Sequence, residues 1–196
     1  DFRPISLTPI LSRLFEKSIV KIFLYPLLNH VKFSNLFSDQ FAFRPTGSTT
    51  AALIKLTHLL ATLLHTYPYV HIIALDFSKA FDTVRHSTLL DKIAHLPLDD
   101  CVFNWLISFL GNREHCTKFH GSVSSRLGIN ASIVQGSALG PVAYLLTASD
   151  LQPIIPGNNL NKYADDSYLI IPSTNSSFIT NELDHVAQWA EKNNLK

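Results

Sequence analysis

The stretch Tyr163-Ala164-Asp165-Asp166 places two adjacent carboxylates between apolar segments, with Leu160 before it and Tyr168-Leu169-Ile170-Ile171 after it. The pattern predicts two short strands joined by a turn at the acids. Neighbouring residues of a straight strand point to opposite faces, but a tight turn at residues 164–166 can direct both acids toward one spot. Two close carboxylates repel each other unless a cation neutralises them. The stretch therefore indicates a metal site, and an ordinary solvated turn is the alternative.

A second acidic position follows a segment with the composition of a buried strand. Residues 69–75 are β-branched and apolar, and Asp76 comes directly after them. Asp82 precedes a predicted helix, so we expect it to cap that helix. For Asp76 the alternative is an aspartate that simply begins a turn. Because hard ions such as Mg²⁺ prefer carboxylate oxygens, Asp76, Asp165 and Asp166 from two strand ends are enough to bracket two metal ions.

Outward from these acids, the apolar pattern predicts helices alternating with strands. Thr8-Pro9 is a start signal for the first helix, and residues 30–48 are expected to form an extended arm. The order of elements after residue 68 implies an α+β sheet with helices packed on one face. The predicted helices cover residues 8–28, 49–65, 83–95, 99–111, 139–150 and 178–194, and the predicted strands cover 69–76, 115–120, 127–134 and the hairpin 160–172.

These motifs resemble those of the reverse transcriptases of non-LTR (LINE-type) retrotransposons. The resemblance begins with Asp76-Phe77-Ser78-Lys79-Ala80-Phe81-Asp82 and the later Tyr163-Ala164-Asp165-Asp166. A lone Tyr-Ala-Asp-Asp would be weak evidence, but an ordered series of motifs at the family's spacing is strong. Further matching segments occur in the family's order at residues 2–7, 40–50, 105–113, 134–141 and 188–195.

The resemblance implies a right-hand polymerase palm, an antiparallel sheet with helices on one face, with helical fingers and with the thumb absent from the chain. Residues 1–68 would supply fingers elements, and residues 69–196 would form the palm with interleaved fingers helices. The implied activity is RNA-directed DNA polymerisation, in which a primer 3′-hydroxyl attacks the α-phosphate of a deoxynucleoside triphosphate. The implied partners are an RNA template, a DNA primer and deoxynucleoside triphosphates. The implied cofactor is a pair of Mg²⁺ ions, for which Mn²⁺ can substitute.

The resemblance also assigns roles at the metal site and around the nucleotide. Asp76 and Asp165 would be direct metal ligands, Asp166 a secondary ligand or electrostatic support, and the backbone carbonyl of Phe77 a further ligand. Phe81 matches the aromatic residue that closes the space beside the sugar 2′ position, with a plain core residue as the alternative.

Five more residues match nucleic-acid or nucleotide contacts of the family. Arg3 matches an arginine that contacts the triphosphate, and Gln135 and Gly136 match the loop that lines the incoming nucleotide. Arg44 would contact the template or a phosphate, with a structural ion pair as the alternative. Tyr163 would pack beneath the primer end, with burial on a strand as the alternative.

Composition fits one compact catalytic core. The chain has 196 residues, of which 46% are hydrophobic and 16% charged. It has no apolar run long enough for a membrane span and no secretory leader, and Cys101 and Cys116 indicate free thiols in a reducing compartment. We therefore expect no membrane partner and an intracellular location in the cytoplasm or nucleus. Since the chain contains no methionine, we expect it to come from inside a longer reading frame.

The net charge of +1 is low for a nucleic-acid enzyme, but the charge is unevenly distributed. Residues 1–65 hold seven Lys and Arg against three acids, and residues 66–196 hold nine against twelve. A basic half for phosphate contacts and an acidic half for cations would suit the implied function. Chance variation between solvated faces is the alternative.

The chain departs from the family pattern at several positions. Val134-Gln135-Gly136 stands where Pro-Gln-Gly is usual, so the rigid φ of proline is lost before the nucleotide loop. Ala42 replaces a usual glycine, and Ser149-Asp150 replaces a usual Asn-Asp pair. These differences leave a second hypothesis, a catalytically inactive remnant or a co-opted nucleic-acid-binding module.

Two features weigh against the other readings. All three aspartates of the implied metal site are present, which favours an enzyme over a remnant. A third reading is an RNA-templated RNA polymerase, which Phe81 disfavours because an aromatic residue beside the sugar excludes ribonucleotides.

Overall fold

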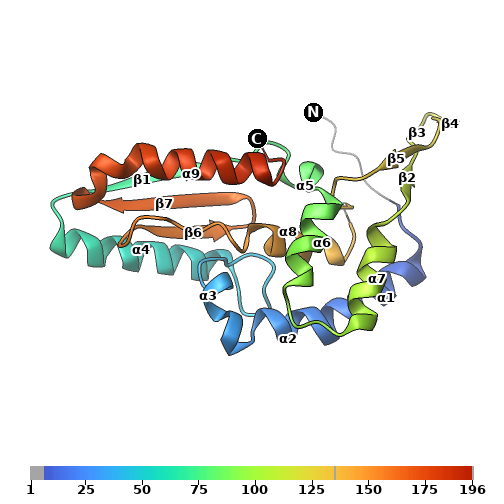
Figure 1. The fold of residues 1–196 in the computed structure, drawn as a ribbon, viewed down its shortest axis with the longest axis horizontal. Helices are drawn as coiled ribbons and strands as arrows, with labels where there is room; N and C mark the ends of the chain where they lie inside the picture. The colour runs from blue at the N-terminus through green and yellow to red at the C-terminus, as the bar shows by residue number, and fades with distance from the viewer. Residues whose placement is uncertain (1–6, 135, 196) are drawn as a thin grey trace.

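The centre of the structure is a three-stranded antiparallel sheet in the order β1-β7-β6 (Figure 1). The structure is a computed structural model that describes residues 7–134 and 136–195. β1 (Val70–Leu75) pairs with β7 (Asp166–Pro172), which pairs in turn with β6 (Asn159–Tyr163). The predicted strand and the predicted acidic hairpin are therefore confirmed, and they are neighbours in one sheet.

One face of this sheet packs against α8 (Leu139–Ala148) and α9 (Ile179–Lys192). Leu169 and Ile171 of β7 share the main buried core with residues of both helices. The two helices are also linked directly, because the indole Nε1 of Trp189 in α9 donates a hydrogen bond of 2.8 Å to Asp150, just after α8. This is the α+β arrangement that the order of elements predicts.

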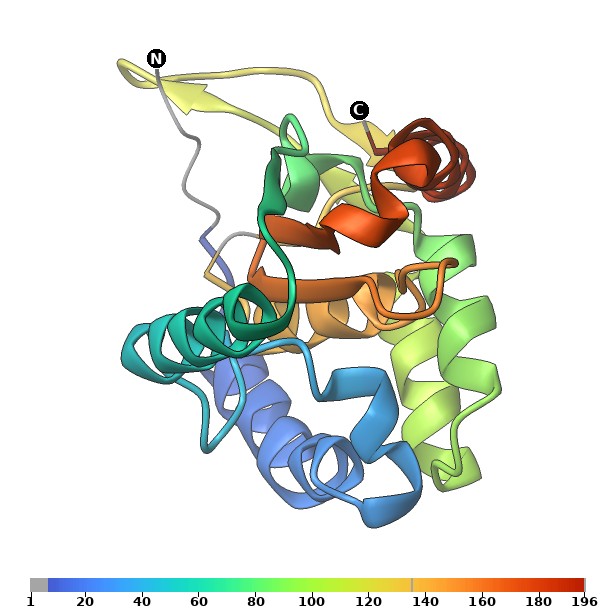
Figure 2. The ribbon, with the colours of Figure 1, turned by 90° about the vertical axis from the view of Figure 1, so that its left-hand side faces the viewer.

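The opposite face is partly covered by α4 (Thr49–Thr66), so α9 and α4 lie on opposite sides of the sheet (Figure 2). The side-chain amide of Asn161 in β6 donates to the backbone carbonyl of Ala52 in α4 at 3.1 Å. α4 contacts mainly β6, and Ile72 of β1 remains 48% exposed. The apolar composition of residues 69–75 thus wrongly predicts a buried strand, because β1 is an edge strand with little cover on this face.

The described residues before α4 form a long helical segment followed by short turns. The predicted helix at 8–28 is confirmed except at its start, since the helix begins after Pro9 and the Thr8 hydroxyl is buried without a partner. The predicted extended arm at 30–48 contains two short helices. No helix of the described ranges is long and apolar enough to span a membrane. The elements are α1 (Ile10–Ile19), the π-helix η1 (Val20–Leu24), α2 (Tyr25–Leu28), η2 (Val31–Phe33) and α3 (Ser34–Phe37).

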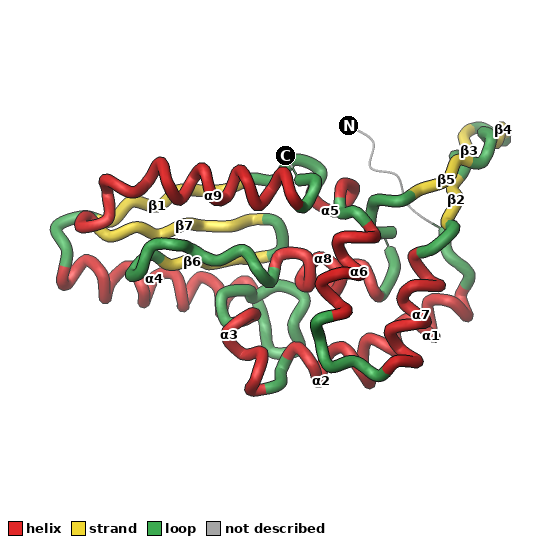
Figure 3. Tube along the Cα trace, viewed as in Figure 1, coloured by secondary structure: helices red, strands yellow, loops and turns green. Residues whose placement is uncertain are grey.

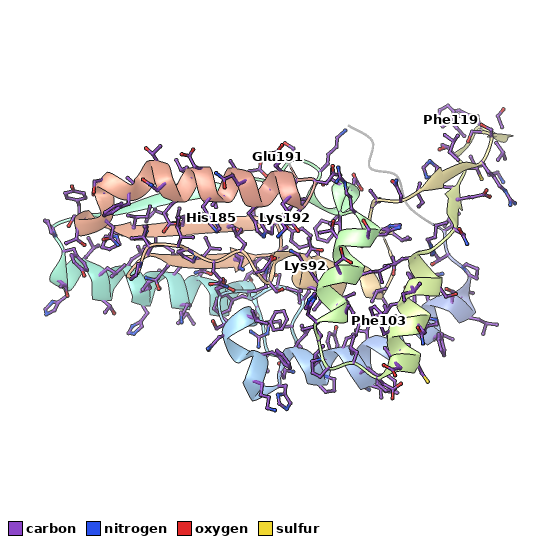
Figure 4. The ribbon with its side chains drawn as sticks, in the orientation of Figure 1. Lys92, Phe103, Phe119, His185, Glu191 and Lys192 are labelled. Atoms are coloured by element: carbon purple, nitrogen blue, oxygen red, sulfur yellow. The ribbon has the colours of Figure 1, made fainter. Side chains whose placement is uncertain are left out.

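Between β1 and β6 the chain leaves the sheet and forms helices and two small strand pairs (Figure 3). β2 pairs with β5 and β3 pairs with β4, and together they form an arm that projects from the rest of the structure, with Phe119 near its tip (Figure 4). A short helix η3 (Ser173–Phe178) precedes α9. The elements of the excursion are α5 (Ala80–Thr83), α6 (His86–Ala94), α7 (Asp100–Leu110), β2 (Arg113–His115), β3 (Lys118–Phe119), β4 (Ser122–Val123) and β5 (Leu127–Ile129).

The first helix predicted after β1, over residues 83–95, begins only at His86, as α6, and a separate short helix, α5, ends at Thr83. Asp82 lies inside α5, so the prediction that it caps the following helix is wrong. The late start of α6 has a tertiary cause, because the backbones of Val84 and His86 hydrogen-bond with residues 130–132 at 2.9 Å in each case. The same bonds take residues 130–132 out of the strand predicted over 127–134, which ends at Ile129.

The outer edge of β6 is covered by residues 39–41. The Lys162 N–H donates to the Asp39 carbonyl at 2.7 Å, and the Phe41 N–H donates to the Lys162 carbonyl at 3.0 Å. The Lys162 ammonium is 1% exposed and lies 2.9 Å from the Asp39 carboxylate. It also donates to the carbonyls of Ala148 and Leu151 at 2.9 and 3.0 Å. Burial lowers the pKa of Lys162 and raises the pKa of Asp39, while the attraction between the two charges opposes both shifts.

We expect Lys162→Met to lower the free energy of unfolding by about 3–5 kcal/mol, because it leaves the buried Asp39 carboxylate without its cation. Urea unfolding followed by circular dichroism measures this loss. The double variant Asp39→Asn, Lys162→Met removes the orphaned charge as well, and it should recover part of the stability.

The exposed pair Arg126–Glu114, at 3.9 Å, is the matched control. Arg126→Met should change the free energy of unfolding by less than about 1 kcal/mol, because solvent screens exposed charges. Equal losses in Lys162→Met and Arg126→Met would contradict the structural role of Lys162.

Candidate active site

The sheet brings the three aspartates singled out in the sequence to one end of two neighbouring strands. Leu75, the last residue of β1, pairs with Ser167 of β7. Continuing this register by one residue places Asp76 opposite Asp166, at the spacing of neighbouring strands. Asp165 precedes Asp166 in the turn between β6 and β7. The structure therefore places Asp76, Asp165 and Asp166 at the same end of the sheet.

The turn between β6 and β7 contains two residues, Ala164 and Asp165, because Tyr163 pairs with Asp166. Ala164 has a φ of 57°, in the left-handed region that favours glycine and that two-residue hairpin turns require. The side-chain amide of Gln40 pairs with both backbone groups of this residue, at 3.1 Å to its N–H and 3.3 Å to its carbonyl. The tight turn predicted from the sequence is thus confirmed, and it is held from outside the hairpin.

The three carboxylates have no hydrogen-bond or ion-pair partner among the described residues. Asp165 is half-buried, and Asp76 and Asp166 are exposed. In the described part of the chain, no three His, Cys, Asp or Glu side chains are gathered closely enough to form a finished metal site. The residues nevertheless fit a divalent cation by donor type and by place, because all three are oxygen donors at one end of the sheet and no Lys or Arg of the described ranges pairs with them.

Tyr144 of α8 lies close to these acids, and sequence reasoning missed it. Its ring is 1% exposed and stacks on Phe81, with ring centroids 4.6 Å apart. Burial, followed by the charges of Asp165 and Asp166, raises the pKa of the Tyr144 phenol above its ordinary value. A neutral, rigid ring therefore borders the acidic site. The available signal was a single phenol in an otherwise apolar helix.

Phe81 and Phe77 flank the site in different ways. Phe81 is half-buried, since it stacks on Tyr144 and meets Phe43 edge-on at 6.1 Å. It thus has both a packing role and an accessible surface, so the two interpretations of its sequence position are compatible. Phe77 is 6% exposed and its ring lies 5.6 Å from that of Trp189. Its side chain belongs to the core, and the metal-ligand role of its backbone carbonyl stays a prediction.

Two of the four remaining residues predicted to contact the nucleotide or primer lie within the described residues. Arg3 and Gln135 lie outside the described residues. Gly136 is exposed and has a φ of 92°, a conformation that suits glycine. Tyr163 is half-buried at the end of β6. The structure brings Tyr163 to the acidic hairpin.

The side chain of Arg44 hydrogen-bonds with the backbone of neighbouring segments. Its guanidinium donates to the carbonyls of Phe37, Gln40 and Leu28. Burial lowers the pKa of Arg44, and the charge of Asp39 opposes that shift. These contacts give Arg44 a structural role other than the ion pair considered from the sequence, and its contact with the template stays a prediction.

Glu16 of α1 holds the segment that follows residues 135–136. It is fully buried, and one carboxylate oxygen accepts from the Ser137 hydroxyl and from the Ala138 N–H, the latter at 3.1 Å. Its other oxygen accepts from the Ser12 hydroxyl at 3.2 Å. Sequence reasoning missed this contact, although an acid within an apolar helical stripe was a signal for it.

An antiparallel sheet with paired acids at a hairpin tip and helices on its face defines a polymerase palm. The chain belongs to the reverse transcriptase family, since the family model described as reverse transcriptase (RNA-dependent DNA polymerase) matches residues 1–196. Its relatives include a probable RNA-directed DNA polymerase from transposon X-element of Drosophila melanogaster, which is 31% identical and covers 85% of the chain. The RNA-directed DNA polymerase from mobile element jockey of the same organism is 30% identical and covers 100%.

A Pol polyprotein from the type-1 retrotransposable element R2 of Bradysia coprophila is 26% identical over 86% of the chain. These relatives confirm the resemblance to reverse transcriptases of non-LTR retrotransposons. The chain spans about a fifth of the length of these curated relatives, with 18%, 22% and 20% of each covered.

Solved structures confirm the fold. A telomerase from Candida Tropicalis in complex with a fragment of telomeric RNA matches with a TM-score of 0.67 over 94% of this chain and 32% of that one, at 12% identity. A telomerase from Candida albicans matches with a TM-score of 0.54 at 12% identity, over 91% of this chain and 31% of that one. The arrangement of sheet and helices is thus that of a reverse transcriptase palm. Membership of this family implies a general requirement for divalent metal ions.

In the presence of a chelator, Asp165→Asn should leave the melting temperature unchanged or raise it by about 1–3 °C, because the substitution relieves repulsion between close carboxylates. Added divalent cation should then stabilise the wild-type protein more than the variant. Differential scanning calorimetry with and without the cation measures both effects.

Asp184→Asn, which neutralises an exposed aspartate of α9, is the control and should respond to the cation as the wild type does. An equal cation response in wild type and Asp165→Asn would exclude Asp165 as a ligand.

Proposed function

We propose that this chain is the polymerising core of an RNA-directed DNA polymerase encoded by a non-LTR retrotransposon. Such an enzyme transfers a nucleotide from a deoxynucleoside triphosphate to a primer 3′-hydroxyl, and pyrophosphate leaves. The observation that carries the proposal is the placement of Asp165 and Asp166 at a hairpin tip beside the end of β1, where Asp76 follows. Family membership over the whole chain supports the same reaction.

In this proposal Asp76 and Asp165 would hold two divalent ions, with Asp166 as a secondary ligand and the Phe77 carbonyl as a further oxygen donor. We propose Mg²⁺ as the ion, with Mn²⁺ as a substitute, because both accept carboxylate oxygens. When bound, two such metal ions would lower the pKa of the primer hydroxyl and neutralise negative charge on the triphosphate. Among the described residues the three carboxylates have no other hydrogen-bond or ion-pair partner, which leaves their oxygens available for this role.

The aromatic residues next to the acids would set the shape of the nucleotide site. Phe81 has accessible surface and is backed by the buried ring of Tyr144. A rigid ring in this position would close the space beside the sugar 2′ carbon and so favour deoxynucleotides. Gly136 and Gln135 would line the nucleotide, Arg3 would contact the triphosphate, and Tyr163 would support the primer end.

We propose an RNA template, a DNA primer and deoxynucleoside triphosphates as the partners of the complete protein. Residues 1–68 would contribute fingers elements, and residues 69–196 the palm with interleaved fingers helices. An intracellular location, in the cytoplasm or nucleus, fits the two exposed free thiols Cys101 and Cys116.

Primer extension tests the proposal. The complete reading frame that carries this chain should extend a DNA primer on an RNA template with Mg²⁺ and deoxynucleotides. The double variant Asp165→Asn, Asp166→Asn should lose at least about 100-fold in rate, the scale of losing one group that stabilises charge in a transition state.

Asp184→Asn is the control for a change of charge and should extend like the wild type. A folded wild-type protein that binds template and primer but does not extend would instead support the inactive remnant.

We expect Phe81 to determine the preference of the enzyme for deoxynucleotides over ribonucleotides. Phe81→Ala should raise the use of ribonucleotides relative to deoxynucleotides by roughly 10- to 100-fold, the range that one steric contact provides. The ratio of kcat/KM for the two nucleotides measures the effect.

Phe43→Ala removes the edge contact of Phe81 but leaves its ring in place, so it should change this ratio little. A Phe81→Ala enzyme that still rejects ribonucleotides would give Phe81 a packing role alone.

A further inference from the structure

The turn that carries Asp165 and Asp166 is held by a side chain 124 positions away in the sequence, that of Gln40. Gln40 is 3% exposed. Its Oε1 accepts from the N–H of Ala164 and from the N–H of Ala42, both at 3.1 Å. Its Nε2 donates to the carbonyl of Ala164 at 3.3 Å. One amide group therefore pairs with both backbone polar groups of the turn residue.

The turn needs this support for two reasons. Ala164 has a φ of 57°, and the Cβ of a residue other than glycine makes this region unfavourable. Ala164 is also buried, at 8% exposed, and its N–H and carbonyl lie beyond the last ladder pair, Tyr163 with Asp166. Without Gln40 these two groups would lose their hydrogen-bond partners in a place with little access to water.

Gln40 can act as a rigid support because its own backbone is fixed on both sides. Residue 40 forms a parallel bridge with Lys162, and the neighbouring Asp39 and Phe41 hydrogen-bond with the backbone of Lys162 at 2.7 and 3.0 Å. The Asp39 carboxylate is also paired with the Lys162 ammonium. The guanidinium of Arg44 additionally donates to the Gln40 carbonyl at 3.5 Å.

The two acids have no comparable side-chain support. The side chains of Asp165 and Asp166 make no hydrogen bond or ion pair with a described residue, so the direction of each carboxylate depends on the backbone of the turn. Ala164 directly precedes Asp165, and its conformation sets the path of the chain into both acids. Whatever fixes Ala164 therefore also orients the acids.

We propose that Gln40 is a positioning residue for the catalytic carboxylates, holding the backbone of Ala164 so that Asp165 and Asp166 face the metal and nucleotide site. The inference rests on the proposed polymerase function for its catalytic consequence. Gln40 touches neither acid and acts through the turn.

Gln40→Met is the sharpest test, because methionine keeps the length of the side chain and removes the amide. In primer extension by the complete protein, kcat should fall about 10- to 100-fold, the scale of a small misplacement of reacting groups. The KM for the deoxynucleotide should stay within about twofold, because the substitution leaves nucleotide contacts in place. Mn²⁺ affinity, measured by electron paramagnetic resonance, should fall several-fold and does not require turnover.

Asn161→Ala is the matched control. Like Gln40, Asn161 of β6 is buried, and its side-chain amide donates a hydrogen bond to a distant backbone carbonyl, that of Ala52. It makes no hydrogen bond with the turn residue Ala164. This variant should lose stability while keeping wild-type kcat and Mn²⁺ affinity. If Gln40→Met does not fold, Gln40→Glu provides the same comparison, because it keeps the acceptor for the Ala164 N–H and loses the donor.

The proposal is overturned if the Gln40 variant keeps kcat and Mn²⁺ affinity within twofold of the wild type. It is also overturned if the Gln40 and Asn161 variants lose kcat in proportion to their loss of stability. A wild-type protein that does not extend primers would refute the proposed function. The Mn²⁺ affinities of wild type and variant would still decide whether Gln40 positions the acids.

Discussion

The acidic hairpin depends on one buried positive charge, the ammonium of Lys162. A lysine enclosed by the core is unfavourable unless its charge and its protons all find partners. Asp39 supplies the opposite charge at 2.9 Å, and the ammonium donates hydrogen bonds of 2.9 and 3.0 Å to the carbonyls of Ala148, at the end of α8, and Leu151, just after it. The ion pair thereby holds residues 39–41 along the edge of β6, which brings Gln40 to the turn. The need to pair the buried charge of Lys162 thus fixes residues 39–41, and through Gln40 it fixes the turn that carries Asp165 and Asp166.

Two sets of acids in this chain differ in their partners. Glu16 and Glu182 are fully buried, and each accepts several hydrogen bonds, so their charges are compensated within the fold. Asp76, Asp165 and Asp166 lie at one end of two strands, and no described residue donates a hydrogen bond to their carboxylates. That contrast separates acids that stabilise the structure from acids whose oxygens have no partner among the described residues.

Local patterns predict the palm well, because each of its elements depends on periodicity within a short segment. The three strands of the sheet and the helices α4, α7, α8 and α9 fall close to their predicted positions. The errors occur where backbone hydrogen bonds join distant segments. Val84 and His86 hydrogen-bond with residues 130–132, which shortens one predicted helix at its start and one predicted strand at its end. The prediction that β1 is buried is wrong for a related reason, since composition does not reveal that a strand lies at the edge of a sheet.

By itself the sequence determined the family, the α+β fold and the identity of the three aspartates, because ordered motifs and acids at strand ends are properties of the linear chain. Only the tertiary structure decided what holds and surrounds those acids. Gln40 reaches Ala164 across 124 positions, and burial in α8, followed by the charges of Asp165 and Asp166, raises the pKa of Tyr144. Such contacts depend on how the sheet edge and α8 pack together, and no periodicity or local propensity encodes that packing.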